Sequence, residues 1–478
     1  MEVDSINNDY FTSYEDLEIH ELMLLDLPRT QTYRHAIETL SDLFKDKIVM
    51  DVGSGTGILS IFCAKAGAKK VFAVEASNVA KLSEKIIAAN KLDHIITVFN
   101  GKVEDFQLPN DIKNVDIIVS EWMGFYLLHE GMLDSVLYAR DKFLSPTGWM
   151  FPESAAIYAS PCSVPTKFDS EDFEGVDLSL LAKELRTQKS HKPQIEILAP
   201  ENLLHEGNII AWIDLKEVTL EELQEFDVKE VFVTQNRGLF QGVCIWFECV
   251  FPSIDDSDPI SLSTSPKEPP THWKQTLITF PEHATEEIDE IGIPLAVQLK
   301  ISRSADSPRR YNLQLEILDA EKEEHAMPCD CILTKCILTK QHLRSMQIFK
   351  RLNNAETVNG ASWGSSGSAA ANKACSDKRT VRRVIAAAQL SFRISRQMAP
   401  VTDEILGCQS FVMNFTLGGL NGYVSGTLIS NLNVPPSYGV SGGPAISPRN
   451  SKINIQRSFI YMNESQLDFQ MKSTRLSK

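Results

Sequence analysis

A glycine-rich segment between an expected strand and an expected helix most constrains the fold of this chain. The apolar run Lys47–Val52 is typical of a buried strand, and Gly53-Ser-Gly-Thr-Gly57 follows it directly, ahead of an apolar helical stretch. Glycines at such a junction permit a tight turn and let backbone N–H groups approach a ligand closely. The segment therefore predicts a ligand-binding turn at the carboxyl end of a strand.

Strand and helix patterns alternate on both sides of this turn, through residues 46–151. Val71–Glu75 and Val115–Ser120 are typical of short buried strands, and Val79, Leu82 and Ile86 recur at helical spacing between them. This alternation predicts an α/β domain with a doubly wound, mostly parallel sheet.

Residues 152–345 have the pattern of antiparallel β structure. Apolar and polar residues alternate in 295–301 and again in 311–317, and the turn-rich link between them predicts a β-hairpin. Further strand-like segments are 208–214, 228–234 and 239–250. We expect an antiparallel β-barrel or sandwich, interrupted at 162–192 by a polar, helix-forming arm.

Residues 346–478 change in character again. Ser362–Ala371 consists mainly of small residues, and Ile405–Pro448 contains no charged residue. This composition predicts a low-complexity tail that is mostly disordered. The doubled segment Cys331–Lys335 and Cys336–Lys340 is too short to indicate a repeat architecture.

Composition places the chain among globular proteins that neither cross a membrane nor depend on disulfides. Acidic residues near the first methionine predict no signal peptide, and no apolar run reaches about 18 residues, so no membrane helix is expected. The nine cysteines are scattered and odd in number, which favours reduced thiols. No metal site is assigned.

The net charge of −16 is unevenly distributed. Residues 351–478 contain 14 Lys/Arg and 6 Asp/Glu, so the first 350 residues carry 33 basic and 57 acidic side chains, a charge of −24. Such an acidic body repels nucleic acid and attracts cationic partners such as basic peptide tails. Solubility alone also accounts for excess acid.

Acidic side chains around the glycine-rich turn indicate which ligand it binds. Asp51 precedes the first glycine by two residues and suits a positively charged ammonium group, whereas it would repel a pyrophosphate. Ile58 stands where a dinucleotide fingerprint has its third glycine. Glu75 ends the next strand, where it can accept ribose hydroxyls, and Glu104 is placed to reach an adenine amino group. These positions favour S-adenosylmethionine over NAD, although each acid alone is equally explained as a loop or cap residue.

Two glutamates lie in one apolar and aromatic segment after the strand that ends at Ser120. Glu121 and Glu130 would repel each other there unless a cation lies between them. A guanidinium fits, because its planar fork presents paired N–H donors to carboxylates. Pairing of each glutamate with a Lys or Arg of the same chain is the alternative.

Four separated motifs resemble those of the protein arginine N-methyltransferases. Asp51–Gly57 resembles motif I, Ser120–Met132 the double-E loop, Thr271–Thr276 the THW loop, and Tyr10–Tyr14 the amino-terminal YFxSY helix. The resemblance covers residues 10 to about 320 and is greatest to type I subfamily 6. It implies a Rossmann-like methyltransferase domain at 46–151, amino-terminal lid helices at 1–45, and a barrel at 152–345 with a dimerisation arm.

The resemblance also implies the role of each site residue. The expected cofactor-binding residues are Arg29, Asp51, Gly53, Gly55, Glu75, Glu104, Tyr14, His20 and Met23. The expected catalytic residues are Glu121, Glu130 and His272, with His272 supporting the double-E loop and proton removal. The expected substrate-binding residues are Tyr10, Met132 and Trp273, and Met23 and Met132 would leave room for a second methyl group.

The chemistry that these residues suit is methyl transfer to a guanidino nitrogen, which needs alignment and electrostatics more than a strong base. We expect a type I arginine methyltransferase that forms a head-to-tail homodimer and acts on basic protein tails such as histones, in the nucleus or cytoplasm. The alternatives are a catalytically weak family member acting as a scaffold, and an NAD-dependent oxidoreductase.

Overall fold

The structure of the protein is a computed structural model. It describes residues 10–12, 14–169, 173–254, 258–324, 329–341 and 343, and the backbone of 409–417, 420–428 and 460–462. The chain divides into one unit of residues 1–361 with 456–478 and a second unit of residues 362–455. Within the described residues, no helix is long and apolar enough to cross a membrane.

Residues 17–44 contain the helices α2 (Leu17–Leu25), α3 (Leu27–Thr39) and α4 (Ser41–Phe44), and residues 10–12 are also helical. Asp16 caps α2 by accepting a hydrogen bond from the backbone of Glu18, and Asp26 caps α3 in the same way from Arg29. Pro28 lies in the first turn of α3, where its missing N–H has no helical partner to lose.

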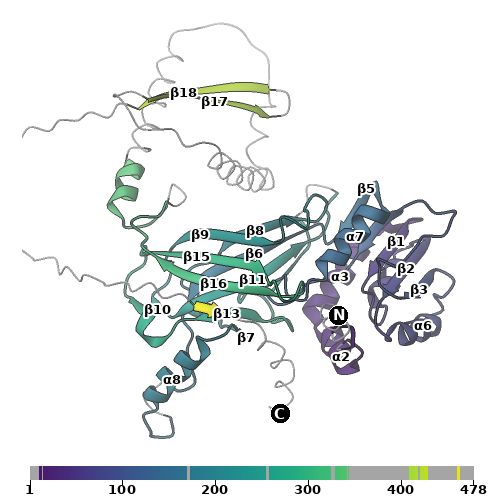
Figure 1. Cartoon of the computed structure of the whole chain (residues 1–478), viewed down its shortest axis with the longest axis horizontal. Helices are drawn as coiled ribbons and strands as arrows, with labels where there is room; N and C mark the ends of the chain where they lie inside the picture. The colour runs from purple at the N-terminus through teal and green to yellow at the C-terminus, as the bar shows by residue number, and fades with distance from the viewer. Residues whose placement is uncertain are drawn as a thin grey trace, which may run out of the picture. The chain divides into compact units, whose positions relative to one another are not determined.

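The expected parallel sheet of the α/β fold has five strands, in the order β3-β2-β1-β4-β5 (Figure 1). The strands are β1 (Ile48–Val52), β2 (Lys70–Glu75), β3 (Ile96–Asn100), β4 (Val115–Val119) and β5 (Leu144–Phe151), and the neighbouring strands pair in parallel. The helices are α5 (Ile58–Lys65), α6 (Ala80–Ala89) and α7 (Leu133–Phe143). The strand order reverses between β1 and β4, so the turns after these two strands meet at the point where such sheets bind ligands.

Helix α6 differs in phase from the sequence prediction. Its buried residues are Ala80, Ser83 and Ile87, whereas Leu82 and Ile86 are only partly buried. The buried face of α6 lies close to the glycine-rich turn, because a Cβ at Gly57 would lie only 2.6 Å from the Ser83 hydroxyl. This close approach requires a small side chain at position 83.

The second part of the unit consists of antiparallel sheets, as expected. One has the order β7-β13-β11-β6-β8 with β12 paired to β11, and another has the order β19-β16-β15-β9. The strands are β6 (Ser154–Cys162), β7 (Gln194–Glu196), β8 (Asn208–Asp214), β9 (Glu225–Val233), β11 (Gly242–Val250), β12 (Ser261–Ser263), β13 (Gln275–Thr279), β15 (Pro294–Arg303), β16 (Tyr311–Leu318) and β19 (Ile460–Met462). The predicted hairpin is β15–β16, in which Leu299 faces Leu315.

The strand predicted at 239–250 is two strands. The first, β10 (Gly238–Phe240), pairs with β14 (Glu286–Ile288) in a separate sheet. The second, β11, begins at Gly242. Gln241 separates them because its backbone N–H donates to Cys162 and its side chain accepts from Val164.

The expected arm projects from the barrel and contains α8 (Ser179–Lys189), as Figure 1 shows. Arg186 anchors it, because its guanidinium contacts Asp169 at 3.1 Å and Glu282 at 3.0 Å. Arg186 is 4% exposed, whereas the side chains of Asp169 and Glu282 are 32% and 35% exposed, so a buried arginine holds two partly exposed carboxylates at the base of the arm.

The predicted tail at 346–478 lies mostly outside the described residues. Within it, β17 (Gln409–Leu417) and β18 (Leu420–Leu428) form an antiparallel hairpin inside the stretch that lacks charged residues. The short strand β19 pairs with β16 of the first unit. None of these three strands is predicted by the sequence pattern.

Candidate active site

The glycine-rich turn adopts backbone conformations that require glycine. Gly53 and Gly55 have φ of 72° and 52°, and the N–H groups of Gly53 and Ser54 donate to the carbonyl of Val74 on the neighbouring strand. The side chains of His20 and Met132 cover the turn, because a Cβ at Gly55 would lie 3.2 Å from His20 and one at Gly53 would clash with Met132. Helix α2 and the start of α7 thus close over the turn.

Asp51 lies completely buried below this turn. Its Oδ2 accepts a hydrogen bond of 2.7 Å from the Ser60 hydroxyl, while Oδ1 has no partner among the described residues. Burial raises the pKa of Asp51 to about 7. A buried acceptor without a donor next to a glycine-rich turn fits the ammonium group of S-adenosylmethionine.

Glu75 is fixed in place at the end of β2. Its Oε2 accepts from the Gly55 N–H and its Oε1 from the Ser77 N–H, both at 2.8 Å. Each carboxylate oxygen retains capacity for a further hydrogen bond, so ribose hydroxyls can be added without breaking this arrangement. Glu104 is exposed at the next turn and accepts from the Ser135 hydroxyl at 2.8 Å.

The loop with the two glutamates follows β4 and has strained backbone. Tyr126, Leu127 and Glu130 have positive φ of 43°, 76° and 77°, which non-glycine residues rarely adopt. Gly124 and Leu127 exchange two backbone hydrogen bonds of 3.0 Å that hold the turn. Strained backbone conformations of this kind are common at functional sites, where the surrounding structure maintains them.

Glu121 pairs with a cation of the same chain. The Nε and Nη2 of Arg29 donate to its Oε2 at 2.8 and 2.6 Å, and Arg29 Nη1 donates to the carbonyl of Met23. Both side chains are less than a tenth exposed. Arg29 therefore pairs with Glu121, which agrees for this glutamate with the alternative in which each glutamate pairs with a Lys or Arg of the same chain. The expected contact of Arg29 with the cofactor stays a prediction.

Glu130 is surrounded by aromatic side chains from the amino-terminal segment. Tyr14 donates to its Oε2 at 2.5 Å, so the structure places Tyr14 at the second glutamate, although we expected it at the cofactor. Burial, together with the charge of Glu121, raises the pKa of Glu130 to about 7. A guanidinium bound between the two glutamates would provide a cationic partner for the Glu130 carboxylate.

Arg309 also belongs to this region, although no sequence motif predicted it. Its guanidinium carbon lies 3.9 Å from the ring centre of Tyr10, and its Nη1 donates to the backbone carbonyl of Glu130 at 2.9 Å. It thus joins the amino-terminal segment to the double-glutamate loop. Gly131 makes this possible, because it has φ of 61° and a Cβ there would lie 2.9 Å from the carbonyl oxygen of Pro308.

His272 contacts the cap of α3, because its Nδ1 and backbone N–H lie 2.6 and 2.8 Å from Asp26 Oδ2. Its expected support of the double-glutamate loop and of proton removal stays a prediction. Trp273 contacts that loop directly, since its indole N–H donates to the Met123 carbonyl at 2.8 Å. Trp273 is only 3% exposed, and its assigned substrate contact stays a prediction.

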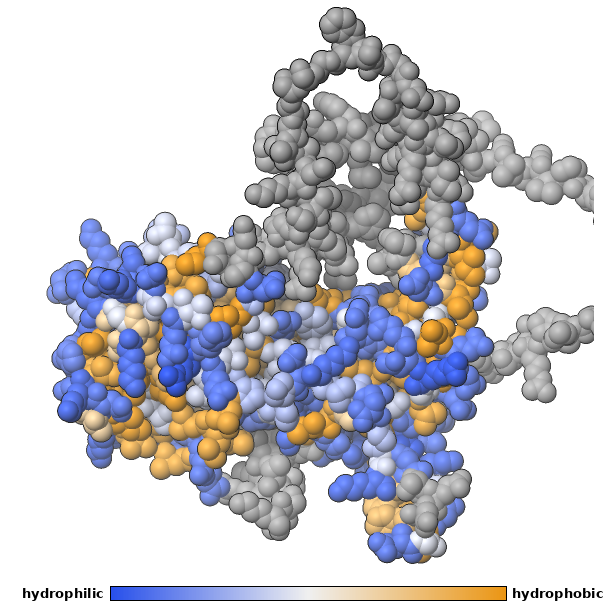
Figure 2. All heavy atoms as spheres, turned by 180° about the vertical axis from the view of Figure 1, so that it is seen from behind, coloured by the Kyte–Doolittle hydropathy of each residue, from blue (hydrophilic) through white to orange (hydrophobic). Residues whose placement is uncertain are grey.

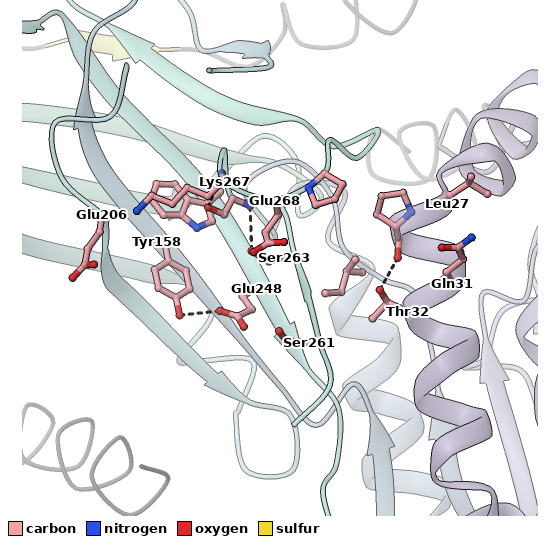
Figure 3. A pocket seen from close by; sticks show the side chains of 15 residues that line it. Leu27, Gln31, Thr32, Tyr158, Glu206, Glu248, Ser261, Ser263, Lys267 and Glu268 are labelled. Atoms are coloured by element: carbon pink, nitrogen blue, oxygen red, sulfur yellow. Dashed lines mark hydrogen bonds between the residues drawn. The ribbon is translucent and has the colours of Figure 1, made fainter. Parts of the chain in front are cut away.

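An open hollow of ≈ 740 Å³ lies between the start of α3 and the barrel, apart from the glycine-rich turn (Figure 3). Its lining includes Glu206, Glu248 and Glu268 against one cation, Lys267. Tyr158 donates a hydrogen bond to Glu248 and its ring stacks on Trp246, with centroids 5.6 Å apart. Its acidic and aromatic lining suits a basic polypeptide better than an anion.

Comparison with known proteins agrees with this geometry. Residues 153–319 match the family model of the arginine methyltransferase oligomerization subdomain, and residues 29–129 match that of ribosomal protein L11 methyltransferase (PrmA). The chain is 38% identical over 335 residues to probable protein arginine N-methyltransferase 6.1 of Oryza sativa subsp. japonica, covering 64% of this chain and 84% of the relative. It is 37% identical over 312 residues to protein arginine N-methyltransferase 1 of Saccharomyces cerevisiae, covering 64% and 86%.

Solved structures give the same result. An Arabidopsis thaliana protein arginine methyltransferase 10 matches with a TM-score of 0.57 and 32% identity, covering 66% of this chain and 97% of that one. The Trypanosoma brucei PRMT1 enzyme–prozyme heterotetrameric complex with AdoHcy matches with a TM-score of 0.57 and 32% identity, covering 66% and 98%.

Proposed function

Because the chain belongs to the protein arginine N-methyltransferase family, as the sequence predicted, we propose that it is an active type I enzyme that forms asymmetric dimethylarginine. Its cofactor is S-adenosyl-L-methionine, and the NAD-dependent alternative is wrong. The observation that carries the proposal is the convergence of Glu121 and Glu130 beside the glycine-rich turn.

The residues around the turn fit the cofactor. Asp51 would hold the ammonium group, Glu75 the ribose hydroxyls, and His20 and Met132 would cover the bound molecule. When bound, S-adenosyl-L-methionine supplies an electrophilic methyl group on a sulfonium. The chain's own residues then have to bring one guanidino nitrogen in line with that methyl group and exclude water.

The two glutamates bind and polarise the guanidinium. The Oε2 of Glu121 is held by Arg29, so its carboxylate cannot rotate freely, and Glu130 is held by Tyr14. Carboxylates on two sides draw positive charge toward the nitrogens that they contact and leave the third nitrogen richer in electrons. The proton leaves that nitrogen only as the new N–C bond forms, so no strong base is required.

The type I assignment is supported by space and by aromatic cover. The Met132 side chain lies against Gly53, so a flexible thioether lines the approach to the turn and can move to admit a second methyl group. The test is methylation of histone and Arg/Gly-rich peptides with radiolabelled S-adenosyl-L-methionine, followed by separation of the hydrolysed methylarginines. Asymmetric dimethylarginine is the expected product. Cofactor binding without any methylarginine would instead favour the scaffold alternative, and symmetric product would refute type I.

Basic protein tails, histones included, are the proposed substrates. The acidic hollow of Glu206, Glu248 and Glu268 supports this choice, because a cationic tail would neutralise its charge. The proposed location, in the nucleus, the cytoplasm or both, rests on the family resemblance alone. Imaging of the tagged chain tests it.

We further propose a head-to-tail homodimer. The arm exposes Phe173, Val176 and Leu180 by 42%, 53% and 77%, and Figure 2 shows apolar side chains on this projection. A second exposed apolar set lies on the amino-terminal helices at Leu22 and Leu25. Two different patches on one chain suit a head-to-tail contact that closes into a ring. Leu180→Asp should yield a monomer in light scattering, and an unchanged dimer would refute this contact.

A further inference from the structure

Three cysteines converge at the carboxyl-terminal end of the barrel, away from the methyl-transfer site. Cys329, Cys331 and Cys336 have their Sγ atoms all within 4.8 Å of one another. Cys331 and Cys336 are each 2% exposed, and Cys329 is half-buried. Buried cysteines elsewhere, such as Cys63 in α5, belong to no such cluster among the described residues.

The doubled five-residue segment builds this cluster. Cys331-Ile-Leu-Thr-Lys is followed at once by Cys336-Ile-Leu-Thr-Lys, so the repeat provides two of the three thiols. Residues 334–341 are helical, which places Cys336 in the first turn and Cys331 just before it.

The segment that holds the cysteines is fastened to the barrel at two points. The N–H of Ile332 donates to the carbonyl of Gly292 at 3.1 Å. The ammonium group of Lys335 donates to the carbonyls of Ala320, Glu321 and Glu323, at 3.2, 2.7 and 2.8 Å. Because Ile332 and Lys335 both lie between Cys331 and Cys336, these contacts hold the segment that connects the two cysteines in place.

We propose that Cys329, Cys331 and Cys336 bind a Zn²⁺ ion through three thiolates. Thiolates are soft ligands that select zinc-class metals, and three protein ligands plus one exogenous ligand complete a tetrahedral zinc site. Binding releases the three thiol protons to solvent and changes no oxidation state. A disulfide would use two of the sulfurs and leave the third unused, whereas one metal ion uses all three.

The half-buried position of Cys329 leaves the fourth coordination position accessible to water or to a further ligand. The bound ion would join the segment after β16 to the helix at 334–341 and so fix the end of the barrel. This role is structural and independent of methyl transfer.

The test uses the full chain purified in reductant without chelator. We expect about one zinc per chain by mass spectrometry, and thiolate-to-cobalt charge-transfer absorption after replacement with Co²⁺. Cys331→Ser should lose both signals. Cys329→Ser alters the most exposed thiol and so spares the packing, and it should weaken Zn²⁺ binding by more than about tenfold, which is the low end of the loss caused by removing a supporting residue. Cys162→Ala, a buried cysteine outside the cluster, is the matched control and should keep both signals.

Three results would overturn the assignment. One is wild-type protein without zinc and without the cobalt absorption. Another is equal metal content in wild type and Cys331→Ser. The third is preferential binding of Cu⁺, or a disulfide between two of these cysteines in the reduced preparation.

Discussion

Replacing Glu130 with glutamine should abolish methyl transfer and, at alkaline pH, make the ligand-free protein more stable. Burial raises the pKa of this carboxyl from its ordinary value of 4.5 to about 7, so the folded protein favours the protonated form. Stability is therefore lost as the pH rises from about 4.5 to 7, and the full cost is present above pH 7. Glutamine carries no charge and still accepts the hydrogen bond from Tyr14.

The size of the effect follows from the pKa. At 1.36 kcal/mol per pKa unit, a rise from 4.5 to about 7 corresponds to roughly 3 kcal/mol of destabilisation above pH 7 and none below pH 4.5. With a urea slope of about 3 kcal/mol/M, the unfolding midpoint of Glu130→Gln should exceed that of the wild type by on the order of 1 M at pH 8. At pH 4.5 the two midpoints should coincide.

Activity should change in the opposite direction. Removal of one charged group that stabilises a transition state costs about 100- to 1,000-fold in kcat, and we expect at least the lower figure. The affinity for S-adenosyl-L-methionine should persist, because Glu130 contacts Tyr14 and Arg309 and not the glycine-rich turn.

The assays are urea unfolding from pH 4.5 to 8, calorimetric titration with the cofactor, and methyl transfer to a histone peptide. Glu84→Gln, on the exposed face of α6, is the matched control and should change none of the three. A midpoint difference that does not vary with pH would refute the buried-charge argument. Retained turnover would refute the double-glutamate mechanism.

Three further substitutions test neighbouring contacts. Glu75→Ala should weaken cofactor binding by about 1.5–3 kcal/mol, the value of hydrogen bonds to a charged group, and an unchanged dissociation constant would show that the ribose assignment is wrong. Arg29→Met should destabilise the protein by about 3–5 kcal/mol in urea unfolding because it leaves Glu121 buried without its cation, and a smaller loss than that of a surface pair would contradict the pairing. Gly131→Ala should cost about 1–3 kcal/mol, because φ is 61° and the new Cβ would press on Pro308; unaltered unfolding and kcat would show that the loop yields there.

Much of the fold was predictable because its signals are local. The strand at 48–52, the glycine-rich turn and the hairpin of β15 and β16 each follow from residues adjacent in sequence. The choice of buried residues in α6 was not predictable. Ser83 is buried by the close approach of Gly57, whereas hydropathy alone ranks serine as a surface residue. Gln241 likewise ends a strand through side-chain contacts that strand patterns do not contain.

The candidate site was predictable in its residues but not in its pairings. Glu121 and Glu130 stand out because charges are rare in an apolar segment, whereas their partners come from distant parts of the chain. Arg29 lies 92 residues from Glu121, and Arg309 lies 179 residues from Glu130. Neither arginine has a sequence neighbourhood that shows which carboxylate or carbonyl it will meet.

The connection from His272 to Glu121 shows why these pairings matter for function. Burial alone would raise the pKa of Asp26. The hydrogen bonds from His272 hold this pKa below its ordinary value, so Asp26 stays charged. The same carboxylate accepts from the backbone of Arg29 at 3.1 Å, and Arg29 in turn fixes Oε2 of Glu121. The loop at 271–276, the cap of α3 and the first glutamate therefore form one hydrogen-bonded unit. A substitution of His272 should therefore weaken guanidinium binding through the position of Arg29, in addition to any effect on proton removal.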